Sequence, residues 1–299
     1  MCLARGRRPL GGRARRRGEE LAHQARLALK KAVGVERVAQ IELALERFRW
    51  LPLSFPVPPI IVNIPAFRLY AFRGKTDAED EMLVMDVVVG GAFDRNTPVF
   101  AANMRYLVFR PFWDVPVSIM QDELGPRAMR EPAYLKGEDM VLVSGEGEEA
   151  NEVAATRQNL AQIGQGVRVR QLPGPKNALG LVKFMLPNAH DVYLHDTPAK
   201  GVFARSQRDV SHGCIRLSDP VALAEHVLRN QPEWTTERIR AAMEGEDDQR
   251  VNLSGPVPVC IIYSTAFARD NGEVNFYADV YGLDVELTRL LKAGYPYPK

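Results

Sequence analysis

The pattern of hydrophobic and polar positions changes twice along the chain. Over residues 19–52, apolar side chains recur at steps of three and four residues, which predicts a helical segment that packs on the core and ends at Pro52. From residue 60 onward, short runs of β-branched and aromatic residues replace this rhythm and predict strands. The predicted apolar face of the helix is made by Val35, Val38, Ile41, Leu45 and Phe48.

Two further helical patterns interrupt the strands in the last third of the chain. Asp219 and Pro220 suit the cap and first turn of one helix. Thr235 opens the other, and Gly245 stops it. The chain is therefore expected to be mainly β with helical additions. The predicted strands are Ile60–Ile64, Phe67–Phe72, Met82–Val89, Tyr106–Phe109, Leu181–Met185 and a closing pair made by Val257–Tyr263 and Val274–Tyr277.

Residues 117–170 form the second break, because the strand rhythm is lost there. The segment separates strand-like runs on either side of it, and a structureless connection of that length is uncommon in a compact domain. It is interpreted as an inserted subdomain or lid over a cleft, with a long solvated surface loop as the alternative. An acidic cluster falls within it, made by Glu146, Glu148, Glu149 and Glu152.

Composition limits the class of protein further. A chain of 299 residues suits one large domain or one domain with an insertion. Its net charge of +2 hides a basic start at residues 1–18, which is interpreted as a disordered tail, with a nucleic-acid or acidic-lipid patch as the alternative. No apolar core of a signal peptide follows that start, and no run approaches the roughly 20 apolar residues that span a bilayer. The clustered arginines are Arg5, Arg7, Arg8, Arg13, Arg15, Arg16 and Arg17.

The candidate chemistry lies around Cys214. The thiolate is the reactive form of cysteine, and a free thiol with a pKa of about 8.5 needs a base or a cation to reach it at neutral pH. His195, at the end of a strand-like run, and His212 supply an imidazole. Arg216 adds positive charge and has the planar fork that binds a carboxylate. The amides of Gly213 and Cys214 are candidates to stabilise an oxyanion.

Other interpretations of these residues remain open at this point. Cys214 could be structural, or a metal could bind to His195, His212 and Cys214, with Asp196 as a further ligand, although the paired motifs of zinc sites are missing. A redox role would need a resolving cysteine, and Cys260 lies in an apolar run that favours an inert, buried thiol. The three cysteines, with Cys2, do not form a disulfide framework.

A glycine-rich turn at residues 174–180 lacks the Gly-Lys-Ser/Thr ending of a phosphate loop. It is interpreted as a turn into the next strand. Its Lys176 and Asn177 are candidates to face a substrate.

His195, fifteen further residues and then Ser-His-Gly-Cys-Ile-Arg at 211–216 resemble the signature of the bacterial L,D-transpeptidases. The resemblance extends over roughly residues 35–285 and is closest to the larger Gram-negative branch, which carries a capping insertion before the catalytic motif. It departs at the start of the chain, where no peptidoglycan-binding region is seen. The further matching stretches are residues 46–52, 62–67, 97–100 and 174–180.

The resemblance implies a catalytic domain at 59–285, built as a bent β-sheet or sandwich, with 117–170 as its capping insertion. It implies that Cys214 attacks a peptidoglycan tetrapeptide stem at diaminopimelate, expels D-alanine and passes the acyl group to an amine, giving 3-3 cross-links. His195 would be the base, oriented by the backbone carbonyl of Asp196, and His212 would help to stabilise the oxyanion. Tyr193, Ser211, Asn177 and Arg216 would contact substrate.

No cofactor, no metal and no nucleic-acid partner are expected. Carbapenems are expected to acylate Cys214, and the location of the substrate implies the periplasm or cell envelope. The acceptor is left open among diaminopimelate, a lipoprotein lysine, a D-amino acid and water. Water would make the protein an L,D-carboxypeptidase or endopeptidase. A catalytically silent wall-binding or metal-binding module is the alternative from another class.

Overall fold

The computed structural model describes residues 34–52, 54–74, 82–91, 95–131, 133–145, 150–269 and 272–294. The predicted basic tail, residues 19–33 of the predicted helical segment and the acidic residues at 146–149 lie outside the described residues. The chain divides into two compact units, Met1–Pro52 with Ser264–Lys299, and Leu53–Tyr263.

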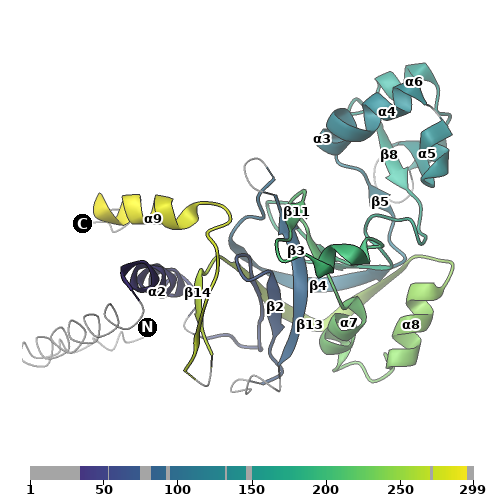
Figure 1. Ribbon diagram of the computed structural model, residues 1–299. Helices are drawn as coiled ribbons and strands as arrows, with labels where there is room; N and C mark the ends of the chain where they lie inside the picture. Colours follow the sequence, from purple (N-terminus) through teal and green to yellow (C-terminus); the bar gives the residue numbers. More distant parts are fainter. Residues whose placement is uncertain are drawn as a thin grey trace, which may run out of the picture. The chain divides into compact units, whose positions relative to one another are not determined.

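The smaller unit joins the two ends of the described chain. It holds the helices α2 (Val35–Phe48) and α9 (Leu283–Lys292) and a hairpin of β14 (Ala266–Ala268) and β15 (Val274–Phe276) (Figure 1). Arg47 Nη1 lies 2.5 Å from Asp284 Oδ1, and the Thr265 hydroxyl donates to the other oxygen of that carboxylate. Gln40 Nε2 donates to the Tyr277 carbonyl at 3.0 Å.

The predicted apolar face of α2 is wrong. Val38 is buried, but Val35 and Leu45 are 69% and 61% exposed. Polar contacts fix the rotation of this helix, because Arg47 pairs with Asp284 and the buried Glu46 carboxylate accepts a hydrogen bond from Trp50 Nε1. Apolar periodicity alone could not show them.

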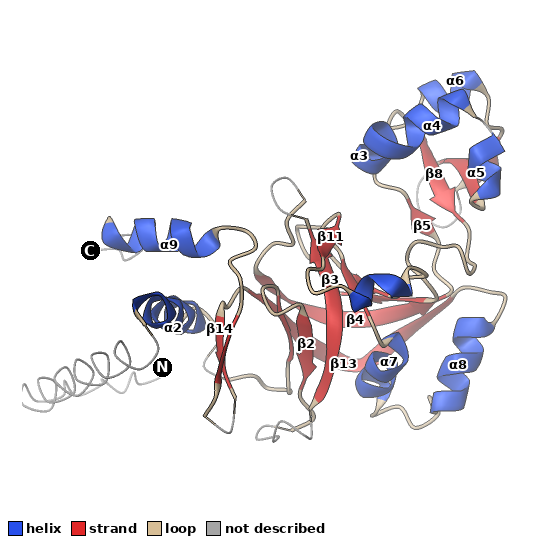
Figure 2. Ribbon diagram, viewed as in Figure 1, coloured by secondary structure: helices blue, strands red, loops and turns tan. Residues whose placement is uncertain are grey.

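The larger unit is built on a nine-stranded sheet in the order β11-β3-β12-β10-β9-β4-β13-β1-β2, in which β2 also pairs with β3. This extra pairing closes the sheet on itself, so its apolar side chains surround one core. The mainly β architecture with a bent sheet is as predicted (Figure 2). The strands are β1 (Ile60–Asn63), β2 (Arg68–Ala71), β3 (Leu83–Gly90), β4 (Phe100–Phe109), β9 (Val182–Met185), β10 (Leu194–His195), β11 (Asp209–Ser211), β12 (Ile215–Leu217) and β13 (Gln249–Ile262).

Two strand predictions need correction. The predicted closing pair does not form, because β13 lies between β4 and β1, which occupy both of its edges, and β15 pairs with β14 in the smaller unit. Strand β4 begins at Phe100, six residues earlier than predicted. Its first half was missed because Ala101, Asn103 and Arg105 are exposed and interrupt the apolar run.

The two helices predicted after residue 217 are confirmed as α7 (Pro220–Leu228) and α8 (Thr236–Glu244). Asp219 Oδ1 accepts from the Ala222 amide at 3.0 Å, and Thr235 caps α8 in the same way. Helix α7 contacts β13 and β3 and so covers part of the sheet. A short 3-10 helix, η2 (Lys200–Ala204), lies between the two halves of the motif.

The segment between β4 and β9 is not a solvated loop, because it has a core of its own. Its four-stranded sheet, in the order β5-β8-β6-β7, is surrounded by short helices (Figure 2). The sequence analysis predicted no strands in this segment, and this prediction is wrong. The strands escape notice because they have only two to five residues and because charged side chains such as Arg168 and Arg170 interrupt their apolar pattern. The core includes Val115, Met120, Ala128, Leu135, Leu142, Leu160 and Val169. The elements are β5 (Trp113–Asp114), α3 (Val117–Ile119), η1 (Met120–Leu124), α4 (Gly125–Arg130), α5 (Ala133–Gly137), β6 (Met140–Ser144), β7 (Asn151–Val153), α6 (Arg157–Ala161) and β8 (Val167–Gln171).

Candidate active site

The register of two parallel strands brings the predicted site residues together. In the β10–β12 pair, Leu194 is opposite Ile215 and His195 is opposite Arg216. Leu194 and Ile215 are fully buried in the core. Because side chains alternate between the two faces of a strand, His195 and Arg216 lie on the opposite face.

Tyr193 and Cys214 extend this arrangement by one step along each strand. The Ile215 amide donates to the Tyr193 carbonyl at 3.1 Å, so the ladder continues beyond the paired residues. Tyr193, His195, Cys214 and Arg216 all line one cavity of about 570 Å³. His195 and Cys214, nineteen positions apart in the sequence, therefore lie on one wall of the cavity.

The inserted subdomain supplies much of the facing wall of this cavity. The side chains that it contributes are mostly apolar, apart from Asp114 and Ser118, whereas the large sheet and its loops contribute Cys214 and the histidines. The residues that line the cavity from the insertion are Trp113, Asp114, Pro116, Ser118, Ile119, Leu124 and Met140.

The Cys214 thiol is only partly accessible, with its sulfur 3.8 Å from the Asp191 carbonyl oxygen. Burial raises the pKa of Cys214, while hydrogen bonds from Tyr193 and the charge of Arg216 act to lower it. The sequence suggested an environment that favours the thiolate. The structure corrects this, since desolvation is the largest effect and keeps the resting thiol protonated.

His195 is 4% exposed, and its Nδ1 lies 2.5 Å from the backbone oxygen of Asp196. A carbonyl only accepts, so Nδ1 carries the proton and Nε2 carries the lone pair. Burial, followed by the nearby charge of Arg216, lowers the pKa of His195 to about 4. The ring is therefore a neutral imidazole at neutral pH.

Tyr193 and Arg216 complete the polar wall. Burial raises the pKa of the Tyr193 phenol, and its contact with Cys214 raises it further. Burial lowers the pKa of Arg216, although the nearby Cys214 opposes this effect. The Arg216 Nε is a buried donor with no hydrogen-bond partner among the described residues. An unpaired buried donor is costly unless a ligand satisfies it.

Two hydroxyl groups hold the loop that carries Cys214. That of Ser211 lies within the loop, and that of Thr97 comes from a distant part of the sequence. Gly213 has φ 115°, a conformation that favours glycine. The Ser211 hydroxyl donates to the Cys214 carbonyl at 2.6 Å and accepts from the Gly213 amide at 3.2 Å. Thr97 Oγ1 donates to the Gly213 carbonyl at 2.8 Å and accepts from the Gly90 amide.

These contacts bear on two of the sequence predictions. The single proton of the buried Ser211 hydroxyl is used within the loop, so this side chain fixes the loop, and because Ser211 also lines the cavity its contact with a substrate stays a prediction. The Gly213 amide points at Ser211, which leaves the Cys214 amide and His212 as the predicted oxyanion donors. His212 is exposed, and its Nε2 lies 2.7 Å from Arg95 Nη1.

Arg95 and Thr97 are the site residues that sequence reasoning missed. They lie more than 110 residues before Cys214 and reach it because β3 runs beside β12 and β11. The sequence carries one signal for Thr97, because the Thr-Pro-Val-Phe stretch at 97–100 is among those that resemble the family. The resemblance alone assigns no function to this stretch.

Asp196 and Asn177 support the site from behind. Asp196 Oδ2 accepts from the Leu181 amide at 2.9 Å, and Lys200 Nζ lies 2.6 Å from Oδ1. Asn177 is buried, and its side-chain amide donates to the carbonyls of Pro111 and Leu172, the residues at which the insertion begins and ends. The expectation that Asn177 faces a substrate is therefore corrected, since it ties the neck of the insertion.

Lys176, the neighbouring candidate, lies at the surface. Its ammonium group donates to the Gly137 carbonyl at 2.8 Å, within the insertion. Among the described residues, no cluster of three or more His, Cys, Asp or Glu side chains could hold a metal ion. No described helix is long and apolar enough to cross a membrane.

The protein is thus a closed β-sheet with a cavity that holds a cysteine and histidine side chains. Comparison with known proteins shows its family. Residues 59–251 match the L,D-transpeptidase catalytic domain family (YkuD). The match covers more than half of the chain, and the chain belongs to this family.

Individual relatives are more distant. A Haemophilus influenzae protein named "Putative L,D-transpeptidase" is 28% identical over 228 residues, which cover 76% of this chain and 45% of that protein. The chain thus spans about half the length of this curated relative. L,D-transpeptidase 3 from Mycobacterium tuberculosis is 13% identical, with a TM-score of 0.29, 69% of this chain covered and 61% of that one. Bd1075 from Bdellovibrio bacteriovorus is 13% identical, with a TM-score of 0.26 and coverages of 80% and 56%.

Proposed function

We propose that the protein is a cysteine-dependent L,D-transpeptidase that transfers an acyl group from a peptidoglycan tetrapeptide stem to an amine. One observation carries this proposal: the β10–β12 register places Tyr193, His195, Cys214 and Arg216 on one wall of one cavity. A nucleophile, a neutral base and a fixed cation then meet in a site that excludes much of the solvent.

The acylation step follows from the two shifted pKa values. The resting pair is a thiol and a neutral imidazole, because burial raises the pKa of Cys214 and lowers that of His195. The proton moves from sulfur to nitrogen as sulfur attacks the carbonyl of diaminopimelate. The carbon–nitrogen bond to D-alanine breaks, and the leaving amine takes the proton from His195.

Arg216 binds a substrate carboxylate in this proposal. Its buried Nε without a partner among the described residues is the feature that supports the role. A stem peptide that ends in diaminopimelate and D-alanine carries carboxylates on both residues, and a guanidinium binds such groups through two parallel hydrogen bonds. The Cys214 amide and His212 stabilise the oxyanion.

The orientation of His195 comes from the backbone. The Asp196 carbonyl accepts from Nδ1 and leaves Nε2 as the basic atom. The side chain of Asp196 is bound by Leu181 and Lys200, so the carbonyl that orients the ring is itself held in place. This arrangement gives the role that a carboxylate has in other triads.

The proposed substrate places the protein in the periplasm or cell envelope. In this proposal the insertion caps the cavity that receives the stem peptide. The proposed acceptor is the side-chain amine of a second diaminopimelate; water as acceptor would make the protein an L,D-carboxypeptidase.

Purified tetrapeptide stem and mass spectrometry of the products test this function. The proposal expects release of D-alanine and formation of a cross-linked dimer, both lost in Cys214→Ala. Release of tripeptide without dimer would reduce the function to hydrolysis. No release of D-alanine by the folded protein would reject it.

A further inference from the structure

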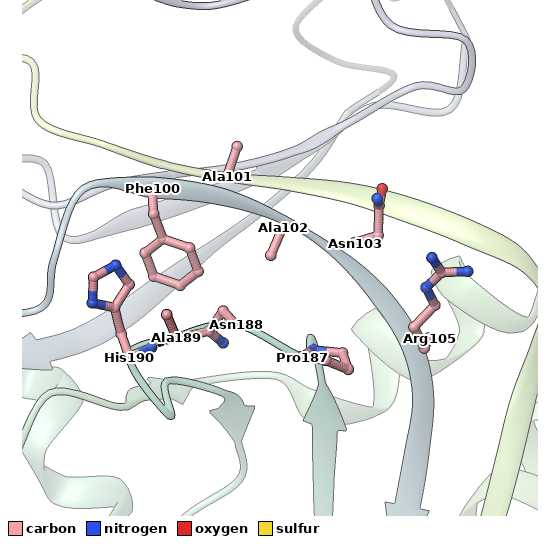
Figure 3. A pocket seen from close by; sticks show the side chains of 9 residues that line it. All are labelled: Phe100, Ala101, Ala102, Asn103, Arg105, Pro187, Asn188, Ala189 and His190. Carbon is pink, nitrogen blue, oxygen red and sulfur yellow. Dashed lines mark hydrogen bonds between the residues drawn. The ribbon is translucent and has the colours of Figure 1, made fainter.

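A second cavity of about 410 Å³ lies between the first half of β4 and the loop that follows β9 (Figure 3). His190 lines both this cavity and the one that contains Cys214, so the two adjoin. We call the second cavity the β4 groove. It is lined by Phe100, Ala101, Ala102, Asn103, Arg105, Pro187, Asn188, Ala189 and His190.

The β4 groove exists because two paired strands separate. Strand β4 pairs with β9 only from Tyr106 to Phe109, whereas its other edge pairs with β13 from Phe100 onward. Over Phe100–Arg105 the edge that faces the groove has no strand partner among the described residues. In an antiparallel ladder successive residues turn their backbone groups to opposite sides, so about half of these N–H and C=O groups face the groove. Such an edge is a template for an added strand.

The opposite wall of the groove is fixed in advance. Asn188 Nδ2 donates to the carbonyls of Leu186 and Val192, and its Oδ1 accepts from the His190 and Val192 amides. The rings of Phe100 and His190 lie 5.1 Å apart between centroids, at the end of the groove that adjoins the cavity of Cys214. Little conformational entropy is therefore lost in ordering this wall when a ligand binds.

The side chains indicate what kind of strand would fit. Alanines on both walls let the backbone of a peptide approach the edge of β4 closely. The guanidinium of the exposed Arg105 lies at the end of the groove away from His190 (Figure 3), where it would meet a carboxylate. An extended peptide that carries a carboxylate matches this chemistry, and its other end would point toward His190 and the catalytic cavity.

We propose that the β4 groove binds the acceptor stem peptide as an added strand and directs its amine at the thioester on Cys214. This inference rests on the proposed function. In the transfer step the acceptor amine attacks the thioester carbonyl, the new carbon–nitrogen bond forms and the carbon–sulfur bond breaks. His195 takes a proton from the amine, and the thiolate that leaves is reprotonated from it.

Four variants of exposed groove residues test the proposal. Ala189→Trp fills the groove, and Arg105→Glu reverses its charge. Ala189→Ser and Arg105→Lys are the matched controls, which keep the space and the charge. With a diaminopimelate tetrapeptide as both donor and acceptor, mass spectrometry gives D-alanine release and the ratio of dimer to tripeptide. The Trp and Glu variants are expected to lower that ratio about tenfold while D-alanine release stays within about twofold, and the controls to match the wild type.

A binding measurement separates this inference from the function on which it rests. When a carbapenem occupies Cys214, the tetrapeptide is expected still to bind in a calorimeter, and Arg105→Glu to weaken that binding about tenfold. An unchanged product ratio in Ala189→Trp and Arg105→Glu would overturn the proposed role of the β4 groove in binding the acceptor. So would a wild type that releases D-alanine but makes only tripeptide. A wild type that releases no D-alanine would instead overturn the proposed function.

Discussion

The nine-stranded sheet and the inserted subdomain both line the cavity that contains Cys214, and they contribute different kinds of side chain. The sheet presents groups that titrate, each placed by strand register or by a backbone hydrogen bond, as His195 is by Asp196. The insertion presents mostly apolar side chains from short helices, among them Ile119 and Leu124, and its one carboxylate in the cavity, Asp114, is paired with Arg170. In the proposed function, the reacting groups therefore lie on the rigid sheet, while a separately packed subdomain determines access and substrate fit.

The strongest test of this division is His195→Gln. Glutamine keeps a polar side chain of similar length but cannot take the thiol proton, so acylation of Cys214 should fall about a thousandfold, near 4 kcal/mol of barrier. Stopped-flow measurement with a carbapenem gives the rate, and circular dichroism checks the fold. A rate within tenfold of the wild type in a folded variant would show that the sheet does not supply the base.

Asn177→Ala tests how the insertion is attached. Loss of the amide leaves the Pro111 and Leu172 carbonyls without this donor inside the neck, so the free energy of unfolding should fall by about 2 kcal/mol. Urea denaturation measures it. Lys176→Ala, an exposed change in the same turn, is the control and should cost no more than about 0.5 kcal/mol. Equal values for the two variants would contradict the role of Asn177 as a tie.

Arg216→Gln tests the electrostatics of the sheet wall. The positive charge lowers the pKa of both His195 and Cys214, so both should rise when it is removed. Acylation should then fall about tenfold at neutral pH, and the acid limb of its pH profile should move up from its position near pH 4. The profile of the acylation rate from pH 3 to 8 measures both. An acid limb that stays in place would rule out this coupling.

Leu124→Ala tests the smallest effect, on the insertion side. Shortening one apolar wall residue should raise KM for the stem peptide about threefold and leave kcat unchanged, because Leu124 touches no reacting group in this account. Steady-state kinetics separate the two constants. A selective loss of kcat would mean that the insertion takes part in the chemistry and would remove the distinction between the two walls.

The sequence alone indicates the candidate site loop because its reactive residue types are contiguous. Gly213, Cys214 and the two histidines lie within twenty residues, and the spacing is distinctive. It could not reveal the ties of that loop to Thr97 and Arg95, which depend on how β3 meets β11 and β12.

Elsewhere, local sequence patterns gave wrong predictions where long-range contacts or burial determine the structure or the pKa. The first half of β4 looked polar because its outer face is exposed, although the strand is paired along β13. The face of α2 follows Arg47 and Asp284, which lie 237 residues apart. The pKa of Cys214 could not be read from its charged neighbours, because burial outweighs them.

The most direct test of the central claim is the intact mass of the protein after incubation with a carbapenem, for the wild type and Cys214→Ala. Cys260→Ala is the matched control, since that thiol is buried in β13, away from the residues that line the catalytic cavity. The account predicts a single adduct on the wild type and on Cys260→Ala and none on Cys214→Ala. An adduct that persists on Cys214→Ala, or no adduct on the folded wild type, would contradict it.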